Sequence, residues 1–139
     1  MILLDSDHLT ALKYTTGERS VRLRTRLAAA SGEVLGTTVV NVEEQMKGWI
    51  AAVAKERQVR RQMSAYRELA RLFTFIQPYH IALLTDAAVD LFEQFGSIRI
   101  GVSDRKIGAI AIANNALLLT ANRRDFEKVL GLRFENWMD

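Results

Sequence analysis

Short, unbroken runs of apolar residues alternate along this chain with longer stretches in which apolar residues recur at helical spacing. The runs are typical of buried strands, and the stretches are typical of amphipathic helices. Clear strands are predicted at residues 2–4, 34–40 and 116–120, an edge strand at 131–134, and a weaker extended segment at 81–84. Because these strands lack polar alternation, they predict a mainly parallel sheet of about four to five strands with helices on both faces.

Polar residues that favour helix N-termini follow the predicted strands and loops. The predicted helix starts are Asp5–Asp7, a capping box from Thr15 to Glu18, Asn41–Glu44, Thr85–Asp86, Ser103 before Asp104, and Asn122. A further helix is predicted at about residues 57–75, and Pro78 ends it. Helices therefore alternate with strands along the chain, which is typical of an α/β fold.

The composition predicts one soluble globular domain that spans residues 1–139. Apolar residues make up 49% and charged residues 25% of the chain, and its one Pro and 8 Gly leave no material for a linker. Cys is absent, which excludes thiol catalysis, disulfides and thiolate metal sites. No apolar run reaches the ~18 residues of a membrane span, and the N-terminal residues carry no basic leader. We therefore expect a cytoplasmic protein without membrane contact.

The formal net charge of +3 hides a strong segregation of charge along the chain. Residues 13–26 hold five basic side chains and one acidic side chain, and residues 47–71 hold seven basic and two acidic side chains. Residues 72–98 carry only acidic charges. The two basic stretches are either solvated helix faces or surfaces that follow a phosphate backbone, and charge alone leaves both interpretations open.

Polar residues that can bind a cation follow several of the predicted strands. Asp5 directly follows the first strand, and Glu44 lies in the first turn of the helix after the second. Asp104 begins a helix after a loop, and Asn122 and Asp125 follow the strand at 116–120. Each of these residues alone could serve as a helix cap or a surface polar residue. Because the carboxyl ends of parallel strands meet at one sheet edge, we expect them to lie together there.

A cluster of carboxylates needs protons or cations to neutralise it. Mg²⁺ prefers oxygen ligands and combines a few carboxylates with water and substrate phosphate. Such a site suits phosphodiester cleavage, because the metal activates water and stabilises the leaving oxygen. His8 and His80 match no two-His metal spacing, so we expect both to be structural or surface residues. Ser6 and Thr120 are candidates to hydrogen-bond to carboxylates or to the scissile phosphate, and Ser6 could equally be only a helix cap.

Four motifs in order along the whole chain resemble those of the PIN-domain ribonucleases, and specifically of the VapC-like toxins of toxin–antitoxin pairs. The matching segments are Met1–Leu9, Val42–Trp49, Asp104–Ala111 and Leu118–Phe126, followed by an ending with Gly131 and Trp137. In the second motif an acid stands four residues before Gly48, which selects Glu44 rather than Glu43.

This resemblance implies a three-layer α/β/α fold and endonucleolytic RNA cleavage that depends on Mg²⁺ or Mn²⁺. It also implies a homodimer and inhibition by a small cognate VapB-like antitoxin, through which alone the protein would contact DNA. By the same resemblance, Asp5 and Asp104 are the principal metal ligands, and Glu44 binds the metal or a water beside it. Asn122 and Asp125 complete the outer position. Many relatives carry Asp where this chain has Asn122, which leaves a second metal ion open.

Two other function classes fit parts of the sequence. Asp5-x-Asp7 after an apolar strand matches the nucleophile motif of haloacid-dehalogenase-type phosphatases, although Leu9 stands where that motif has Thr or Val. The basic stretches also fit a catalytically silent module that binds RNA or a protein partner.

Overall fold

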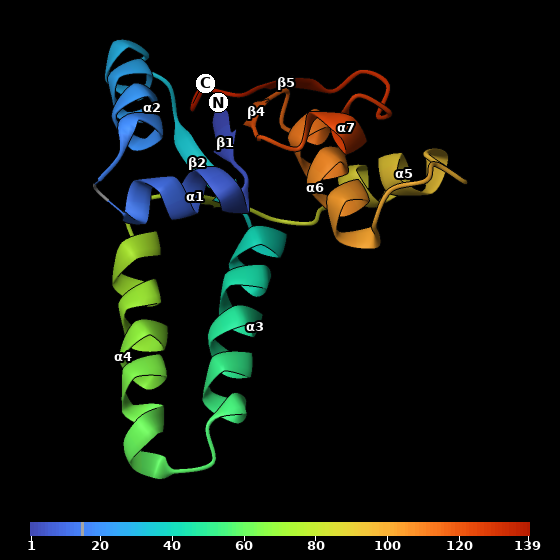
Figure 1. The fold of residues 1–139 in the computed structure, drawn as a ribbon. Coiled ribbons are helices and arrows are strands. Elements are labelled where there is room, and N and C mark those ends of the chain that lie inside the picture. Colours follow the sequence, from blue (N-terminus) through green and yellow to red (C-terminus); the bar gives the residue numbers. More distant parts are fainter. Residues whose placement is uncertain (15) are drawn as a thin grey trace.

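The computed structural model describes residues 1–14 and 16–139. Strands and helices alternate along these residues (Figure 1). The strands are β1 (Ile2–Leu4), β2 (Leu35–Thr38), β3 (His80–Ala82), β4 (Leu117–Leu119) and β5 (Arg133–Glu135). The helices are α1 (Ser6–Lys13), α2 (Glu18–Ala29), α3 (Val39–Lys55), α4 (Val59–Ile76), α5 (Asp86–Gln94), α6 (Val102–Ala113) and α7 (Arg123–Phe126).

The strands form one sheet in the order β3-β2-β1-β4-β5, and all neighbouring pairs are parallel. β1 lies at the centre, where Leu3 pairs with Gly36 on one side and with Leu118 on the other. The predicted parallel sheet is confirmed, and the strand predicted at 131–134 does lie at an edge. The weak extended segment near residue 81 forms the opposite edge.

Helices cover both faces of the sheet. Successive side chains of β1 point to opposite faces, so each face has its own core. Leu3 packs in a core with Ile107 and Ile110 of α6. Ile2 and Leu4 pack on the other face with Leu9, Leu12 and Leu23 of α1 and α2. This arrangement confirms the three-layer α/β/α fold. In the described part of the chain, no helix is long and apolar enough to cross a membrane.

Helices α3 and α4 form a hairpin that extends away from the sheet (Figure 1). The first turn of α3 lies at the end of β2, so its residues reach the sheet edge. The connection between the two helices lies at the far end of the hairpin. Helix α3 therefore joins the sheet edge to a part of the molecule well away from it.

The predicted strand at 34–40 and the helix start at Asn41 were both wrong in their boundaries. β2 ends at Thr38, and Val39 and Val40 already belong to α3. Thr38 is the N-cap, and its side-chain oxygen accepts a hydrogen bond from the Asn41 N–H at 3.1 Å. Thr38 thus caps the N-terminus of α3. The sequence did not indicate this helix start, because Val39 and Val40 are β-branched and favour a strand.

Two other helix starts differ from the sequence prediction. Ser103 does not cap α6, because this helix already begins at Val102 with Gly101 as its N-cap. In the predicted capping box from Thr15 to Glu18, Thr15 lies outside the described residues, and α2 begins at Glu18 after Gly17. The φ of +104° at Gly17 places this N-cap in a region that glycine adopts readily.

The predicted caps at Thr85 and Asn122 are confirmed. Thr85 accepts from the Ala88 N–H, and Asn122 accepts from the Asp125 N–H. In both cases a polar side chain directly precedes the helix and stands a few residues after the end of a strand, β3 at Ala82 or β4 at Leu119. The sequence signal at these positions is therefore the local one that capping chemistry requires.

The close approach of β2 and β3 gives a stability prediction. A Cβ at Gly36 would collide with the His80 carbonyl of β3, whereas a Cβ at Gly48 in α3 meets no atom within 4 Å. Gly36→Ala is expected to destabilise the protein by about 1–3 kcal/mol, as overpacking does. Gly48→Ala should stabilise it by about 0.5–1 kcal/mol, because Ala is the better helix former. Urea denaturation of both variants measures this, and equal midpoints would contradict the close strand contact.

Candidate active site

Asp5 lies at the centre of the polar edge formed by the carboxyl ends of β1, β2 and β4. Its side chain is 7% exposed, and hydrogen bonds hold both carboxylate oxygens. Oδ2 accepts from Thr120 Oγ1 at 2.7 Å, and Oδ1 accepts from the Ser6 N–H and from Asn41 Nδ2, each at 2.8 Å. The structure therefore fixes the orientation of this carboxylate through groups from three separate segments.

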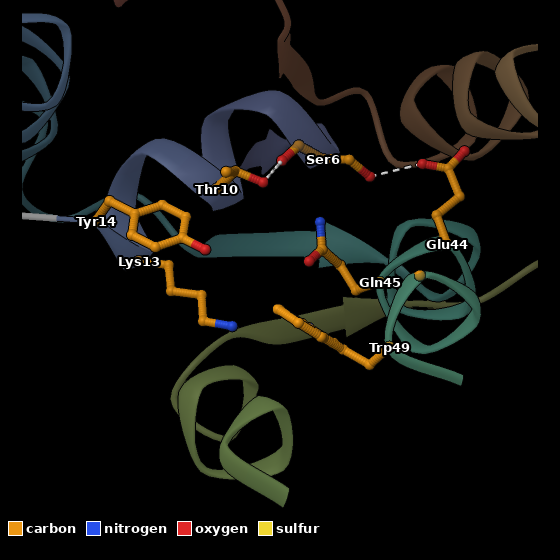
Figure 2. A pocket seen from close by; sticks show the side chains of 8 residues that line it. Ser6, Thr10, Lys13, Tyr14, Glu44, Gln45 and Trp49 are labelled. Carbon is orange, nitrogen blue, oxygen red and sulfur yellow. Dashed lines mark hydrogen bonds between the residues drawn. The ribbon is translucent and has the colours of Figure 1, made fainter. Parts of the chain in front are cut away.

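Glu44 reaches the same edge from the second turn of α3. Its Oε2 accepts a hydrogen bond of 2.6 Å from Ser6 Oγ, as Figure 2 shows. The neighbouring Glu43 instead pairs with Lys47 on the helix surface, at 3.6 Å. Of the two adjacent acids, the structure thus places Glu44 beside Asp5, which matches the register that the motif spacing predicts.

Asn122 connects the remaining two acids. Its Nδ2 donates to Asp104 Oδ2 at 3.3 Å and to Asp125 Oδ2 at 3.2 Å. Its Oδ1 caps α7 by accepting from the Asp125 N–H at 3.4 Å. In this arrangement Asn122 bridges two carboxylates as a donor, and its oxygen serves the helix end.

Burial is the largest cause of the raised carboxyl pKa values at this edge, and neighbouring carboxylates add to it. Burial raises the pKa of Asp104 to about 6, and the negative charges of Asp5, Glu44, Asp125 and Asp7 add to this effect. Burial also raises the pKa values of Asp5 and Glu44. Such mutual shifts require the acids to lie within electrostatic reach of one another. The structure therefore brings the sequence-predicted acids into one cluster.

The cluster has no internal counter-charge at its centre. Among the described residues, no Lys, Arg or His forms an ion pair with Asp5, Glu44 or Asp104. Asp125 lies 3.9 Å from Lys128 at its periphery. One buried and two half-buried carboxylates that repel one another and form no ion pair are a donor set suited to a hard divalent cation.

The three predicted metal ligands do not converge on one point. In the part of the chain that the structure describes, no group of three acidic or His side chains is arranged to hold an ion. Mg²⁺ is commonly held by only one or two carboxylates and keeps several waters. The residues present therefore fit such an ion by their chemistry and burial, while a closed set of three protein ligands is absent from these residues.

Sequence reasoning missed Asn41 as part of this site. Its side chain is completely buried, and its Nδ2 donates to Asp5 Oδ1 and also to Ser6 Oγ at 3.1 Å. Its Oδ1 accepts from Thr38 Oγ1 at 2.7 Å. An Asn near a helix start has the pattern of a cap, and only the fold shows that its amide instead supports a carboxylate.

Asp7 and His8 form a second hydrogen-bonded group beside the site, which the sequence did not indicate. The His8 ring is fully buried, and its Nδ1 lies 2.5 Å from Asp7 Oδ1. Its Nε2 accepts from the Trp137 N–H at 3.2 Å, and Asp7 Oδ2 accepts from the Ala121 N–H at 2.8 Å. His8 is thus structural, as expected, and its hydrogen bond with Trp137 connects the start of α1 to the C-terminal segment. His80 is exposed.

Comparison with solved structures identifies proteins that share this fold. No protein-family model and no curated protein matches this sequence. Solved structures do match over nearly the whole chain. A chain of DNA-bound VapBC from Salmonella typhimurium is 20% identical, with 98% of this chain and 97% of that chain covered and a TM-score of 0.75.

Two further structures give the same result. A chain of VapBC2 from Rickettsia felis, bound to a DNA fragment from its promoter, is 20% identical, with 99% of both chains covered and a TM-score of 0.71. A chain of FitAcB from Neisseria gonorrhoeae is 17% identical, with 99% of this chain and 98% of that chain covered and a TM-score of 0.71. The PIN-like α/β/α fold that the sequence motifs imply is therefore the fold of this chain.

Proposed function

We propose that this chain is a metal-dependent endoribonuclease of the VapC type, in which residues 1–139 act as one PIN-like nuclease domain. The observation that carries the proposal is the cluster of the buried Asp5 with the half-buried Glu44 and Asp104, which form no ion pair among the described residues and in which burial raises the pKa of Asp104 to about 6. This cluster lies at the sheet edge where ligands of parallel α/β folds bind. The fold that the chain shares with the VapBC chains supports the same function.

Each residue of the cluster has a defined part in this proposal. Asp5 and Asp104 hold Mg²⁺ or Mn²⁺, and Glu44 binds the ion or positions a water beside it. When bound, the metal supplies the positive charge that activates water and stabilises the leaving 3′ oxygen. Asn41 and Thr120 keep the Asp5 carboxylate in place, and Ser6 does the same for Glu44.

The outer part of the site is formed by the residues after β4. Asn122 holds the Asp104 carboxylate through its amide, and Asp125 adds a further negative charge. Because Asn122 is neutral and its oxygen caps α7, the site carries less negative charge than one with Asp at this position. We therefore propose one firmly held metal ion.

A cleavage assay with residues 1–139 separates this proposal from the two alternatives. We expect a labelled single-stranded RNA to be cut with Mg²⁺ or Mn²⁺ and to remain intact with chelator. Vanadate-sensitive hydrolysis of a phosphate monoester would instead favour the phosphatase. RNA binding that survives Asp5→Asn, without cleavage by the parent protein, would favour the silent binding module.

The two basic stretches differ in how the structure uses them. In α2, guanidinium groups support the C-terminal segment and α1: Arg22 donates to the Met138 carbonyl, Arg26 to the Asn136 carbonyl and Arg24 to the Leu12 carbonyl. These arginines have a structural use. By contrast, among the described residues Arg57, Arg60 and Arg61 at the far end of the hairpin form no ion pair.

We expect the hairpin end to contribute to RNA affinity. Neutralising Arg57, Arg60 and Arg61 together should weaken RNA binding and reduce the slope of log K against log salt by about 2, at ~0.7 per lost phosphate contact. Replacing the same three residues by Lys keeps the charge and should leave the slope unchanged. Fluorescence anisotropy at several salt concentrations measures both. An unchanged slope in the neutral variant would show that these arginines are only a solvated helix face.

We also propose a VapB-like antitoxin as protein partner and a homodimer as the assembly, with DNA contacted only through the antitoxin. The antitoxin is expected to place an Arg or Lys among Asp5, Glu44 and Asp104, where its charge replaces the metal. Its apolar residues would lie along the helices within residues 7–30 and 42–75. Raising the Mg²⁺ concentration should then weaken inhibition by a C-terminal antitoxin peptide. Inhibition independent of Mg²⁺ would place the peptide outside the metal site.

A further inference from the structure

A pocket of about 380 Å³ adjoins the carboxylate cluster. It lies between α1 and α3 and shares Ser6 and Glu44 with the cluster, so the two sites are continuous. Away from these residues its wall is formed by Lys13, Gln45 and Trp49, together with Thr10 and Tyr14. Figure 2 shows these side chains around one space, with the Ser6–Glu44 hydrogen bond at its edge.

The lining combines a flat aromatic surface with polar groups. The Trp49 indole is half-buried, and Tyr14 is 54% exposed at the rim. Lys13 Nζ lies 4.6 Å from the centroid of a Trp49 ring and 3.1 Å from Glu68 Oε2, and it is buried without a well-aligned hydrogen bond. No hydrogen bond joins the Gln45 side chain to any residue that the structure describes. The pocket therefore offers an aromatic surface, which Lys13 contacts while paired with Glu68, and an amide with free donors and acceptors.

This combination suits a nucleobase better than an apolar side chain. Proteins that bind single-stranded nucleic acid stack bases on aromatic side chains, and every base has a face that stacks. A Gln amide can both donate to and accept from a base edge. An apolar occupant would leave the polar atoms of the Gln45 amide without partners, which is unfavourable.

We infer that this pocket binds one base of a single-stranded RNA, stacked on Trp49 and contacted at its edge by Gln45, beside the phosphate that lies at the carboxylates. The inference rests on the proposed function for the identity of the ligand as RNA. It adds a place where the enzyme distinguishes one base from another. Trp49 and Gln45 are then residues that determine specificity.

The chain contains 2 Trp residues, which allows a direct test. In a Trp137→Phe background, Trp49 is the sole Trp, and its emission reports stacking. An eight-nucleotide single-stranded RNA of mixed sequence, added with chelator so that no cleavage occurs, should quench this emission to saturation. An oligonucleotide with the same backbone and abasic residues should bind more weakly and leave the emission unchanged.

Affinity and specificity measurements complete the test. Trp49→Ala should weaken binding of the same RNA by about 5- to 150-fold, which is the contribution of stacking one base on an aromatic ring. Trp49→Phe should retain most of the affinity. Tyr66→Ala is the matched control, because Tyr66 is an exposed aromatic of α4 outside the pocket lining, and should bind like the parent. Thermal melts establish that each variant is folded.

Gln45→Ala gives an independent readout that does not require removal of the indole. It should change which base is preferred at the cleavage site, as mapped on a mixed pool of RNA sequences. RNA that binds and is cleaved without quenching Trp49 emission would overturn the inference and leave the proposed function intact. Quenching by an apolar peptide but not by RNA would also overturn it. Quenching by RNA in a chain that cleaves nothing would support the base pocket and refute the nuclease.

Discussion

Replacing Asp104 by Asn is expected to lower RNA cleavage by about a thousandfold, which corresponds to ~4 kcal/mol of transition-state free energy. The substitution removes one carboxylate charge from the site proposed to hold the metal but changes the side-chain volume little. The hydrogen bond from Asn122 Nδ2 to Asp104 Oδ2 can be kept, because an amide oxygen accepts it equally well. The loss should therefore appear in cleavage and not in folding.

The same variant is expected to be more stable than the parent when no metal is present. Burial and the surrounding acids raise the pKa of Asp104 from 3.8 to about 6 in the folded protein. A carboxyl whose pKa is raised by folding favours the folded state while protonated, and that contribution is lost as the pH rises through the folded pKa. Asp104→Asn has no carboxyl to ionise at this position. The free energy of unfolding that the variant gains over the parent should therefore be absent near pH 4 and largest above pH 6.

Thermal melts with chelator across this pH range, made on the samples used for cleavage, measure both effects. We expect a melting temperature a few degrees above that of the parent at neutral pH and equal melting temperatures in acid. A variant that cleaves like the parent would remove Asp104 from the active site. An unfolded or less stable variant would contradict the expected relief of repulsion at Asp104.

Glu44→Gln is expected to reduce cleavage by about a hundredfold or more, whereas Glu43→Gln should change it by less than about twofold. Adjacent residues on a helix point about 100° apart, so only one of the two can face the sheet edge. The structure turns Glu44 toward Ser6 and turns Glu43 toward Lys47 at the surface. The pair forms a matched comparison, because both changes remove one charge from the same turn of α3.

Single-turnover cleavage at saturating metal measures the chemical step for both variants. An additional titration with Mn²⁺, monitored by calorimetry, shows whether Glu44→Gln weakens metal binding or only slows cleavage. If Glu43→Gln is the inactive variant, the register of this helix toward the site is wrong. Equal activity of both variants would mean that α3 contributes no acid to the chemistry.

The fold was predictable from the sequence because its strands are buried on both faces. Runs such as residues 2–4 and 117–119 contain only apolar residues, and this pattern distinguishes a parallel sheet between helices from a half-exposed sheet. Helix caps such as Thr85 were also predictable from the local sequence. Boundaries failed where two local signals compete, as at Val39 and Val40, where β propensity obscured the helix that Thr38 caps.

The site was predictable only in part. The acids follow from their positions after strands, since parallel topology brings the carboxyl ends of those strands together. Asn41 and His8 act through partners far away in the sequence, at Asp5 and at Trp137, and no local pattern marks such contacts. The use of the α2 arginines likewise depends on the C-terminal segment that folds back onto them, so charge patterning alone could not assign it.

The most direct test of the central claim is the chemistry of the RNA ends that the protein produces. Total cellular RNA is incubated with the protein and Mg²⁺, with the protein and chelator, and with the Asp5→Asn variant and Mg²⁺, and the new ends are mapped. We expect discrete cuts that leave a 5′ phosphate, disappear with chelator, return when excess Mg²⁺ is added, and are absent with Asp5→Asn. Cuts that persist in chelator, or that leave a 5′ hydroxyl, would contradict metal-dependent cleavage at the carboxylate cluster.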